Sequence, residues 1–259
     1  MTRQEPDVPS GYVGIHEGGA EVVVLKAMAG PICEALQNSS LYEYASRHPE
    51  AREYHGRGVV YGVPLPNCKA RVVIRRSRHG GLLRAITGER FLRGTRAPRE
   101  LAAALRLTRA GVPTPQIIAY VTYPAGGPFR RADVVTCEVE GASDLGALLT
   151  NVPDAMAKEG LLQAVGSLLA RLTQAGARHP DLNVKNILIV AGENEAREAW
   201  LLDVDRVWFD EPGDRRVAMA NANRLTRSLR KWRQSYGISV DESDIRRLLV
   251  PVNGEPLNA

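Results

Sequence analysis

Short apolar runs separated by turn residues characterise the first part of the chain. β-Branched and other apolar residues cluster at residues 21–26 and 71–75, with shorter runs at 12–13 and 59–61. Runs of this kind, bounded by Gly, Pro and Asn, are typical of strands. A single helix is expected near residues 30–47. The pattern therefore predicts a lobe built on an antiparallel sheet.

A helix followed by two more strands is expected next. The helix should cover residues 98–109, because Gly111 and then Pro113 form the usual sequence of a helix stop. The strands are expected near residues 116–123 and 132–139, joined by a Gly-rich hairpin. Both strands are expected to belong to the first, β-rich lobe.

From residue 141 onward the apolar positions follow a helical period. A short helix is expected to start at Ser143 and Asp144, and Leu161, Leu168 and Leu172 share one face of a longer helix. The other elements expected here are a strand pair at 186–190 and 200–204, and helices at 217–235 and 241–249. The chain is thus predicted to be α+β, with a β-rich lobe over residues 1–140 and a mainly helical lobe over residues 141–259.

Composition and charge limit the kinds of partner. The 259 residues are 44% hydrophobic and carry a net charge of +5 with a pI near 9.3, which favours anionic partners. Three widely spaced cysteines without a C-x-x-C pair suggest reduced thiols rather than a disulfide framework or a zinc site. The apolar runs are too short to cross a bilayer and the N-terminus lacks a signal core, so we expect a cytoplasmic chain with at most peripheral membrane contact.

The strongest chemical signal is the segment His179-Pro180-Asp181-Leu182-Asn183-Val184-Lys185-Asn186, followed by Asp203 after an apolar run. In phosphoryl transfer from ATP, one carboxylate orients the acceptor hydroxyl, and a carboxamide with a second carboxylate holds Mg²⁺. Asp181 is the candidate for the first role, and Asn186 and Asp203 are the candidate metal ligands. Asp and Asn also cap ordinary turns, but the preceding amphipathic helix and the following strand favour a kinase.

Candidate nucleotide contacts lie in the first lobe. Gly56 and Gly58 could form a turn whose backbone N–H groups approach phosphates, although most such glycines are plain turns. Arg75 ends a Val-Val-Ile run at the position where protein kinases carry lysine, and Glu100 on the next helix is placed to pair with it. The alternative is a solvated strand arginine and a helix acid, and Arg75 is favoured over Arg76 because it occupies the motif position.

Glu138 and Val139 are the remaining candidates for cofactor binding. They follow the strand expected at residues 132–139 and stand where kinases link their lobes. Adenine is held at such a link by backbone groups, so the side-chain identities carry little information. The prediction rests on their place in the order of elements.

Several stretches together resemble the lipopolysaccharide core sugar kinases, closest to the 3-deoxy-D-manno-octulosonic acid (Kdo) kinases. The matching stretches are residues 179–186, Leu202-Asp203-Val204-Asp205-Arg206, Gly56-Arg57-Gly58, Ile74-Arg75-Arg76, residues 78–82, 95–100, 110–115 and 223–231. The resemblance implies a protein-kinase-like two-lobed fold with an ATP cleft between the lobes, the cofactors ATP and Mg²⁺, and transfer of the γ-phosphate to a sugar hydroxyl of the lipopolysaccharide inner core, on Kdo or heptose. By position it makes Asp181, with His179 beside it, catalytic, Asn186 and Asp203 metal ligands and Arg75 a phosphate contact. Val204 stands where the family carries Phe.

Two basic collections fit an anionic acceptor. Arginines crowd residues 71–99, and a second group surrounds Arg224, Arg227, Arg230, Lys231 and Arg233. The plain interpretation is a solvated helix face opposite a buried apolar stripe. The acceptor implied by the resemblance, a Kdo-lipid A type of molecule at an anionic membrane surface, would meet the same charges. The resemblance implies a location at the cytoplasmic face of the bacterial inner membrane. Nucleic acid is not expected, because aromatic residues total 5% and are not interleaved with the arginines.

Two other interpretations stay open at this point. Other small-molecule kinases, of the aminoglycoside or choline type, and atypical protein kinases share the H-x-D-x-x-x-x-N loop. A non-catalytic pseudokinase module is suggested by Arg75 in place of lysine, but the presence of Asp181, Asn186 and Asp203 argues against it.

Overall fold

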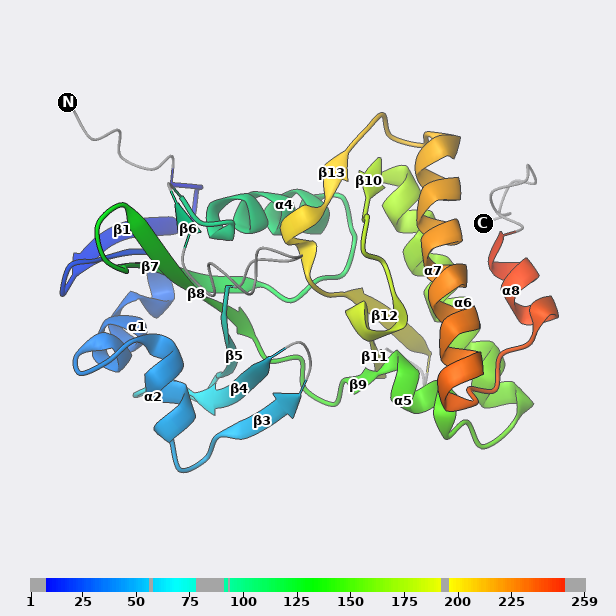
Figure 1. Ribbon diagram of the computed structural model, residues 1–259, viewed down its shortest axis with the longest axis horizontal. Helices are drawn as coiled ribbons and strands as arrows, with labels where there is room; N and C mark the ends of the chain where they lie inside the picture. Colours follow the sequence, from blue (N-terminus) through cyan, green and yellow to red (C-terminus); the bar gives the residue numbers. More distant parts are fainter. Residues whose placement is uncertain (1–7, 56–57, 78–90, 93, 192–195, 250–259) are drawn as a thin grey trace. The chain divides into compact units, whose positions relative to one another are not determined.

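The computed structural model describes residues 8–55, 58–77, 91–92, 94–191 and 196–249. They divide into two compact units. The first unit spans Met1–Ala102 and Gln116–Glu138, and the second spans Ala103–Pro115 and Val139–Ala259. Each unit is considered by itself below, with element labels as in Figure 1.

The first unit is dominated by one antiparallel sheet. Its strands are β1 (Tyr12–Glu17), β2 (Ala20–Leu25), β3 (Arg52–His55), β4 (Val59–Pro64), β5 (Arg71–Arg76), β6 (Phe91–Leu92), β7 (Ile117–Pro124) and β8 (Phe129–Cys137). The sheet order is β1-β2-β7-β8-β5-β4-β3, and β6 pairs with β8. The helical segments are η1 (Lys26–Met28), α1 (Ala29–Leu36), α2 (Leu41–Arg47) and the start of α4 (Ala97–Arg109). A large antiparallel sheet accompanied by helices is the mixed class that the sequence predicts.

The two faces of β5 carry different chemistry. Ile74 is fully buried in the core that the sheet forms with α1 and α2. Side chains alternate along a strand, so Arg75 lies on the opposite face. Arg76 returns to the core side, where its guanidinium lies 4.3 Å from the centroid of the Tyr42 ring and its Nε lies 3.7 Å from Oδ1 of the fully buried Asp133.

The second unit is mainly helical. Its helices are α5 (Leu145–Thr150), α6 (Ala155–Gln174), α7 (Arg215–Tyr236) and α8 (Glu242–Leu249), with 3₁₀ turns η2 (Val184–Asn186) and η4 (Val204–Arg206). Its strands are β9 (Ser143–Asp144), β10 (Ala177–Arg178), β11 (Ile187–Ala191), β12 (Arg197–Leu201) and β13 (Trp208–Phe209). They form a three-stranded sheet in the order β12-β11-β9 and a β10-β13 pair. In Figure 1 α6 and α7 run side by side.

The single helix predicted over residues 30–47 is wrong, because the chain forms α1 and α2 there. Ser40 has an extended backbone, and its hydroxyl accepts a hydrogen bond from the backbone N–H of Glu43. The Glu43 carboxylate accepts one from the backbone N–H of Ser40 in return. This reciprocal capping box starts a new helix, and the Ser-x-x-Glu spacing was readable in the sequence.

The short helix predicted to start at Ser143 and Asp144 begins at Leu145. Those two residues form β9, which pairs with Ile189 and Leu188 of β11. Asp144 is then the N-cap of α5, and its carboxylate accepts a hydrogen bond from the backbone N–H of Ala147. Aspartate is among the residues preferred at a helix N-cap.

Two findings bear on membrane contact and redox chemistry. Among the described residues, no helix combines the length and apolarity that crossing a bilayer demands. Cys33, Cys68 and Cys137 are all free and partly exposed. The absence of a disulfide agrees with the cysteine spacing.

Candidate active site

The segment with the strongest chemical signal forms a loop between two strands of the second unit. It leaves β10 at Arg178, turns through residues 179–183 and enters β11 by way of the 3₁₀ turn η2. Leu182 and Val184 are fully buried and anchor the loop. The polar residues between these anchors are thereby held by the core of the unit.

The backbone carbonyl of Asp181 accepts two hydrogen bonds within the loop. It accepts hydrogen bonds from Nδ2 of Asn183 at 2.7 Å and from Nδ2 of Asn186 at 3.0 Å. The other amide atom of Asn183, Oδ1, accepts from the backbone N–H of Lys185 and caps η2. Because the Nδ2 of Asn186 is committed to Asp181, its Oδ1 is the atom that remains for a cation.

Asp203 lies at the same end of the β11–β12 hairpin as Asn186. Ile187 is opposite Leu201 in the hairpin, and the backbone N–H of Leu202 donates to the carbonyl of Asn186 at 2.8 Å. Asp203 then takes the left-handed conformation, with φ 58° and ψ 53°. Such a conformation is uncommon outside glycine, and it ends β12 before the residue 204 that the sequence predicts as its limit.

The donor atoms of Asn186 and Asp203 suit Mg²⁺. The Asp203 side chain is exposed and makes no capping hydrogen bond. No group of three or more His, Cys, Asp or Glu side chains that could hold a metal occurs among the described residues. Mg²⁺ commonly binds through one or two carboxylates together with substrate phosphates rather than in a closed protein cage. A carboxylate and a carboxamide oxygen therefore fit this ion.

His179 connects the loop to the strand that precedes Asp203. Its ring is 1% exposed. Nδ1 accepts from the backbone N–H of Asp181 at 3.2 Å, and Nε2 lies 3.3 Å from the carbonyl oxygen of Leu202. The two contacts assign the neutral tautomer with its proton on Nε2. Burial lowers the pKa of His179, against the opposing effects of the Leu202 carbonyl and of the carboxylates of Asp203, Asp181 and Asp205.

The lowered pKa of His179 makes stability depend on pH. An unfolded histidine has a pKa of about 6.5, so below that pH the unfolded chain takes up a proton that the folded chain resists. We expect the free energy of unfolding to fall on acidification from about pH 7.5 to 5.5, by at most about 1.4 kcal/mol per pH unit for this group. Urea unfolding followed by tryptophan fluorescence reports on the second unit, because Trp200, Trp208 and Trp232 all lie in it.

The variant His179→Gln should reduce that pH slope, and the exposed His16→Gln is the matched control. An unchanged slope in His179→Gln, with the transition still cooperative, would contradict the assignment of a buried neutral ring.

Helix α7 fixes the loop from one side, which the sequence analysis did not foresee. The fully buried Asn221 accepts from the backbone N–H of His179 at 2.9 Å and donates to the carbonyl of Ala177 at 2.8 Å. Ser228, seven residues on, accepts from the backbone N–H of Val184 at 3.2 Å. Residues at i and i+7 share a helix face, and the intervening Leu225 is buried on it. Polar residues within that apolar stripe were the available signal.

Two arginines flank the Asp181 carboxylate, and they too were missed as site residues. Arg206 of η4 donates from Nη1 to Oδ2 at 2.6 Å. Arg224 of α7 donates from Nε to the carbonyl of Pro180 at 3.1 Å, and its Nη2 lies 3.7 Å from Oδ1 of Asp181. The sequence pattern assigned Arg224 to a general basic face and Arg206 only to a signature.

In the first unit, Arg75 and Glu100 form the predicted ion pair. Nη2 of Arg75 donates to Oε1 of Glu100, whose side chain is only 5% exposed, whereas 26% of the Arg75 side chain is exposed. Arg76 lies on the opposite sheet face beside Asp133. The structure thus distinguishes the two arginines: Arg75 pairs with Glu100, and Arg76 lies beside Asp133.

Of the two glycines predicted to approach phosphates, Gly58 lies among the described residues. Gly56 lies outside the described residues. Gly58 forms a bend directly before β4, and the preceding paired position of the β3–β4 hairpin is His55 opposite Val59. Gly58 therefore lies directly beside the end of β4 that pairs with His55 of β3.

The Glu138 side chain and the backbones of Glu138 and Val139 make hydrogen bonds to different partners. The Glu138 carboxylate is held by Tyr54 at 2.7 Å, Arg71 at 3.0 Å and Arg52 at 3.4 Å. Its backbone N–H donates to the carbonyl of Arg71, and the carbonyl of Val139 accepts from Ala142. The Glu138 side chain is therefore engaged with other residues of the first unit.

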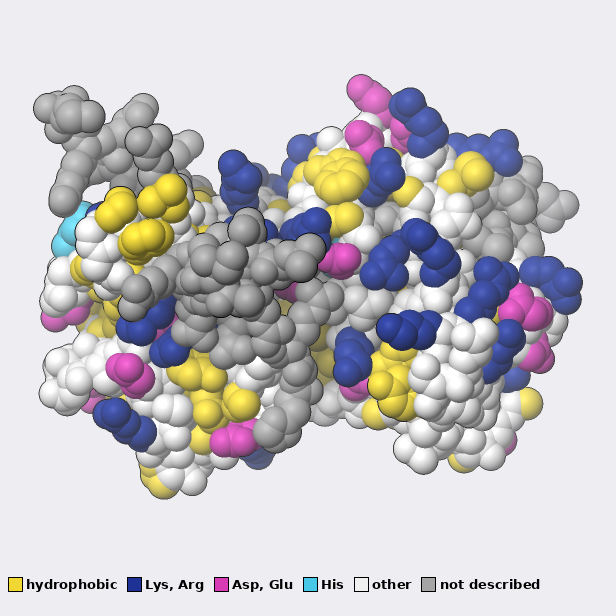
Figure 2. Space-filling view, in the orientation of Figure 1, with side chains coloured by type: hydrophobic (Ala, Val, Ile, Leu, Met, Phe, Trp, Pro, Cys, Tyr) yellow, Lys and Arg dark blue, Asp and Glu magenta, His cyan; other side chains and the backbone are white. Residues whose placement is uncertain are grey.

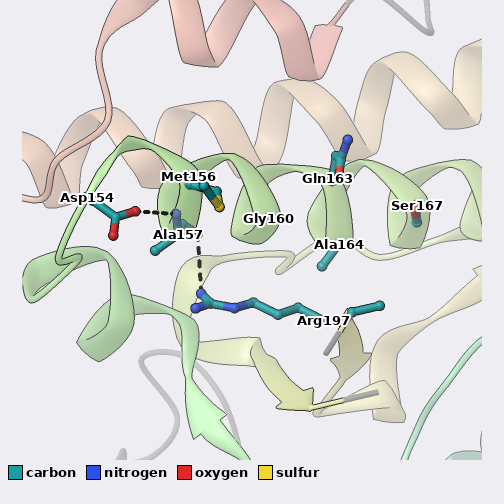
Figure 3. A pocket seen from close by; sticks show the side chains of 9 residues that line it. Asp154, Met156, Ala157, Gly160, Gln163, Ala164, Ser167 and Arg197 are labelled. Atoms are coloured by element: carbon teal, nitrogen blue, oxygen red, sulfur yellow. Dashed lines mark hydrogen bonds between the residues drawn. The ribbon is translucent and has the colours of Figure 1, made fainter. Parts of the chain in front are cut away.

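An open groove of about 780 Å³ runs along α6 and β12 (Figure 3). In it Asp154 accepts from the backbone N–H of Ala157, and Arg197 donates to the carbonyl of Ala157. Met156, Gly160, Gln163, Ala164, Ser167 and Ala196 complete its lining. None of the residues predicted to carry the chemistry lines this groove.

Figure 2 shows Lys and Arg side chains gathered over α7 and α8. Part of this charge is neutralised, because Arg230 and Arg233 share the carboxylate of Glu242 at 2.9 and 2.8 Å. Arg227 and Lys231 are exposed. The basic face of α7 therefore carries less uncompensated positive charge than the sequence pattern suggests. The arginines at 78, 84, 90 and 93 lie outside the described residues.

Comparison with known proteins gives consistent results. A family model described as "Lipopolysaccharide kinase (Kdo/WaaP) family" matches residues 45–250. A 3-deoxy-D-manno-octulosonic acid kinase of Vibrio parahaemolyticus is 32% identical over 180 residues, which cover 68% of this chain and 71% of the relative. One from Actinobacillus succinogenes is 34% identical over 199 residues, covering 75% and 80%. A solved structure of WaaP in complex with acyl carrier protein is similar in fold, with a TM-score of 0.55 and 17% identity over 95% of this chain and 90% of that one.

Proposed function

The chain belongs to the lipopolysaccharide kinase (Kdo/WaaP) family, and we propose that it phosphorylates a hydroxyl of 3-deoxy-D-manno-octulosonic acid in the lipopolysaccharide inner core. Family membership makes the chain a phosphotransferase that uses ATP. The acceptor sugar is proposed from the relatives, which are named for that sugar acid. Heptose is the alternative acceptor.

One observation carries the proposal at the level of the site. The carbonyl of Asp181 holds Asn186, and Asn186 in turn holds Leu202, directly before Asp203. Two hydrogen bonds to backbone carbonyls thus connect the segments that carry the three residues predicted to act together. We assign the acceptor hydroxyl to Asp181 and Mg²⁺ to Asn186 and Asp203. When bound, that ion would neutralise charge on the ATP phosphates. His179 is a positioning residue, because both of its ring nitrogens face backbone groups.

The reaction exchanges one phosphorus–oxygen bond for another. The acceptor oxygen forms a bond to the γ-phosphorus, and the bond from that phosphorus to the β,γ-bridging oxygen breaks, with its electron pair leaving on ADP. The hydroxyl proton passes to the Asp181 carboxylate and then to solvent. No other co-reactant is needed.

We extend the proposal to a protein-kinase-like organisation in two lobes that binds a nucleotide. We propose that the lobes divide near residue 140. Arg75, held by Glu100, would contact the phosphates, Gly56 and Gly58 would approach them, and backbone groups of Glu138 and Val139 would hold adenine. The WaaP similarity supports such a fold, and the Arg75–Glu100 pair supports the phosphate contact.

Glu100→Gln tests the role of that pair. The neutral amide no longer compensates the Arg75 charge, and a hydrogen bond to a charged group contributes about 1.5–3 kcal/mol. We therefore expect kcat/KM for ATP to fall by roughly tenfold to a hundredfold, mainly through KM. Glu17→Gln, at an exposed position of the same unit, is the control. Equal ATP kinetics in wild type and Glu100→Gln would remove Arg75 from the nucleotide site.

We also propose peripheral binding at the cytoplasmic face of the inner membrane, supported by the net charge of +5 and the exposed Arg227 and Lys231. Near an anionic surface each basic residue contributes about 1 kcal/mol. The double variant Arg227→Gln, Lys231→Gln should therefore weaken binding to vesicles containing anionic phosphatidylglycerol roughly tenfold or more. The double variant Lys69→Gln, Arg109→Gln removes the same charge elsewhere. Equal losses in both would indicate a nonspecific charge effect.

The decisive experiment for the activity uses the purified full chain, MgATP and a Kdo-bearing lipid A acceptor. Mass spectrometry should find one added phosphate, and fragmentation should place it on the Kdo residue. Phosphate on heptose alone would replace the acceptor assignment. Turnover only with an aminoglycoside, choline or a polypeptide would overturn the lipopolysaccharide assignment.

A further inference from the structure

Asp181 lies between two arginines from different elements of the second unit. Arg206 comes from η4 and contacts Oδ2, whereas Arg224 comes from α7 and approaches Oδ1. Their side chains are 51% and 30% exposed, and that of Asp181 is 24% exposed. The cluster is therefore open to a molecule approaching the proposed catalytic carboxylate.

Both arginines retain unused hydrogen-bond donors. A guanidinium has five N–H groups. Among the described residues, the hydrogen bonds of Arg206 involve only Nη1, and those of Arg224 involve only Nε. The remaining N–H groups can donate to an incoming anion, and the planar guanidinium matches a carboxylate through two parallel hydrogen bonds.

The local charge favours an anionic ligand. Two guanidinium groups face the one Asp181 carboxylate. Arg224 is also held in place by the carbonyl of Pro180, so less side-chain freedom is lost when it binds. Exposed ion pairs contribute little to stability, so fold stability alone gives a weak reason for placing two arginines here.

We propose that Arg206 and Arg224 recognise the carboxylate of an acidic sugar acceptor and so select a sugar acid for phosphorylation beside Asp181. This inference rests on the proposed function and specifies the group by which the acceptor is read. The acceptor carboxylate accepts hydrogen bonds from the N–H groups that Arg206 and Arg224 do not use within the protein. Binding of the correct acceptor thereby places its hydroxyl next to the carboxylate that orients it.

The test compares two acceptors that differ at one group. The first is a Kdo-bearing lipid A acceptor with the free carboxylate, and the second carries the primary amide in its place. For each enzyme the ratio of kcat/KM for acid over amide is measured. Wild type should prefer the acid by about tenfold to a hundredfold, since each tenfold corresponds to about 1.4 kcal/mol and a charged hydrogen bond is worth roughly one to two such steps.

Arg206→Gln and Arg224→Gln should each reduce this ratio toward one, chiefly by raising KM for the acid. Arg206→Lys keeps the charge without the planar donor pair and should give an intermediate ratio. Arg215→Gln, at an exposed arginine near the start of α7, should keep the wild-type ratio. Stabilisation by MgATP shows that each variant is folded.

The outcomes separate the recognition from the activity. If wild type phosphorylates Kdo but the Gln variants keep its preference for the acid, the recognition proposal is wrong and the activity stands. The recognition proposal is also wrong, and the activity stands, if kcat/KM falls when the lipid A phosphates are removed but not when the carboxylate is amidated. If wild type phosphorylates no Kdo acceptor, or only a neutral heptose, the proposed function fails and the recognition proposal fails with it.

Discussion

Replacing Asp203 with asparagine is expected to abolish Mg²⁺-dependent phosphate transfer. The substitution removes the one negative charge among the two side chains assigned to the metal, and a bound divalent ion contributes several kcal/mol to stabilising the transferred phosphate. Because each 1.36 kcal/mol is a factor of ten in rate, the loss should reach about a thousandfold or more. The folded structure should tolerate the change, because the Asp203 side chain is exposed and makes no capping hydrogen bond.

Asparagine is chosen over alanine because Asp203 has φ 58°, and Asn is among the residues that adopt this left-handed conformation most readily. Alanine would add backbone strain to the loss of charge. Thermal stabilisation by ATP should be larger with Mg²⁺ than with EDTA in wild type, and equal in Asp203→Asn. Asp210→Asn, at an exposed position seven residues on, should behave as wild type. Full Mg²⁺-dependent turnover in Asp203→Asn would remove this residue from the metal site.

The parts of the fold that the sequence predicts best are those set by local pattern. The runs that became β2 and β5 combine β-branched residues with clear turn residues, and α4 ends before Gly111, whose φ of 73° requires the freedom of glycine. The break between α1 and α2 was also local, since Ser40 and Glu43 form the capping box. The prediction of one continuous helix over residues 30–47 does not include this capping signal.

The supports of the candidate site were harder to predict because they connect distant parts of the chain. Asn221 contacts the backbone of Ala177 and His179, which are 44 and 42 residues away. Nothing in the composition of α7 identifies the strand or loop it faces. A polar residue on a buried helix face indicates that a partner exists, but only the packing of α7 against the loop shows which one.

The neighbours of Asp181 show the same division between local and distant information. Its hydrogen bonds to Asn183 and Asn186 follow from the spacing within one loop. Its contact with Arg206 depends on the left-handed turn at Asp203, which redirects the chain after β12. The sequence therefore predicts the type of chemistry, whereas the arginines around the carboxylate require the three-dimensional structure.

Asp181→Asn should leave MgATP binding intact and reduce phosphate transfer by roughly a hundredfold to ten-thousandfold, which is the range for loss of a positioned acid or base. The backbone carbonyl of Asp181, which holds Asn183 and Asn186, is unchanged by the substitution. The loop should therefore keep its shape. What is lost is a carboxylate that can accept the hydroxyl proton, because an amide oxygen is a far weaker base.

Asp181→Asn and Asp203→Asn should differ in the Mg²⁺ dependence of ATP binding. Each substitution removes one carboxylate charge from the candidate site, yet only Asp203→Asn should abolish the Mg²⁺-dependent part of ATP stabilisation. Single-turnover transfer to the Kdo acceptor, measured at saturating MgATP, isolates the chemical step from nucleotide binding. A wild-type rate in Asp181→Asn would show that another group handles the acceptor proton. Loss of MgATP binding in Asp181→Asn would instead place Asp181 with the metal ligands.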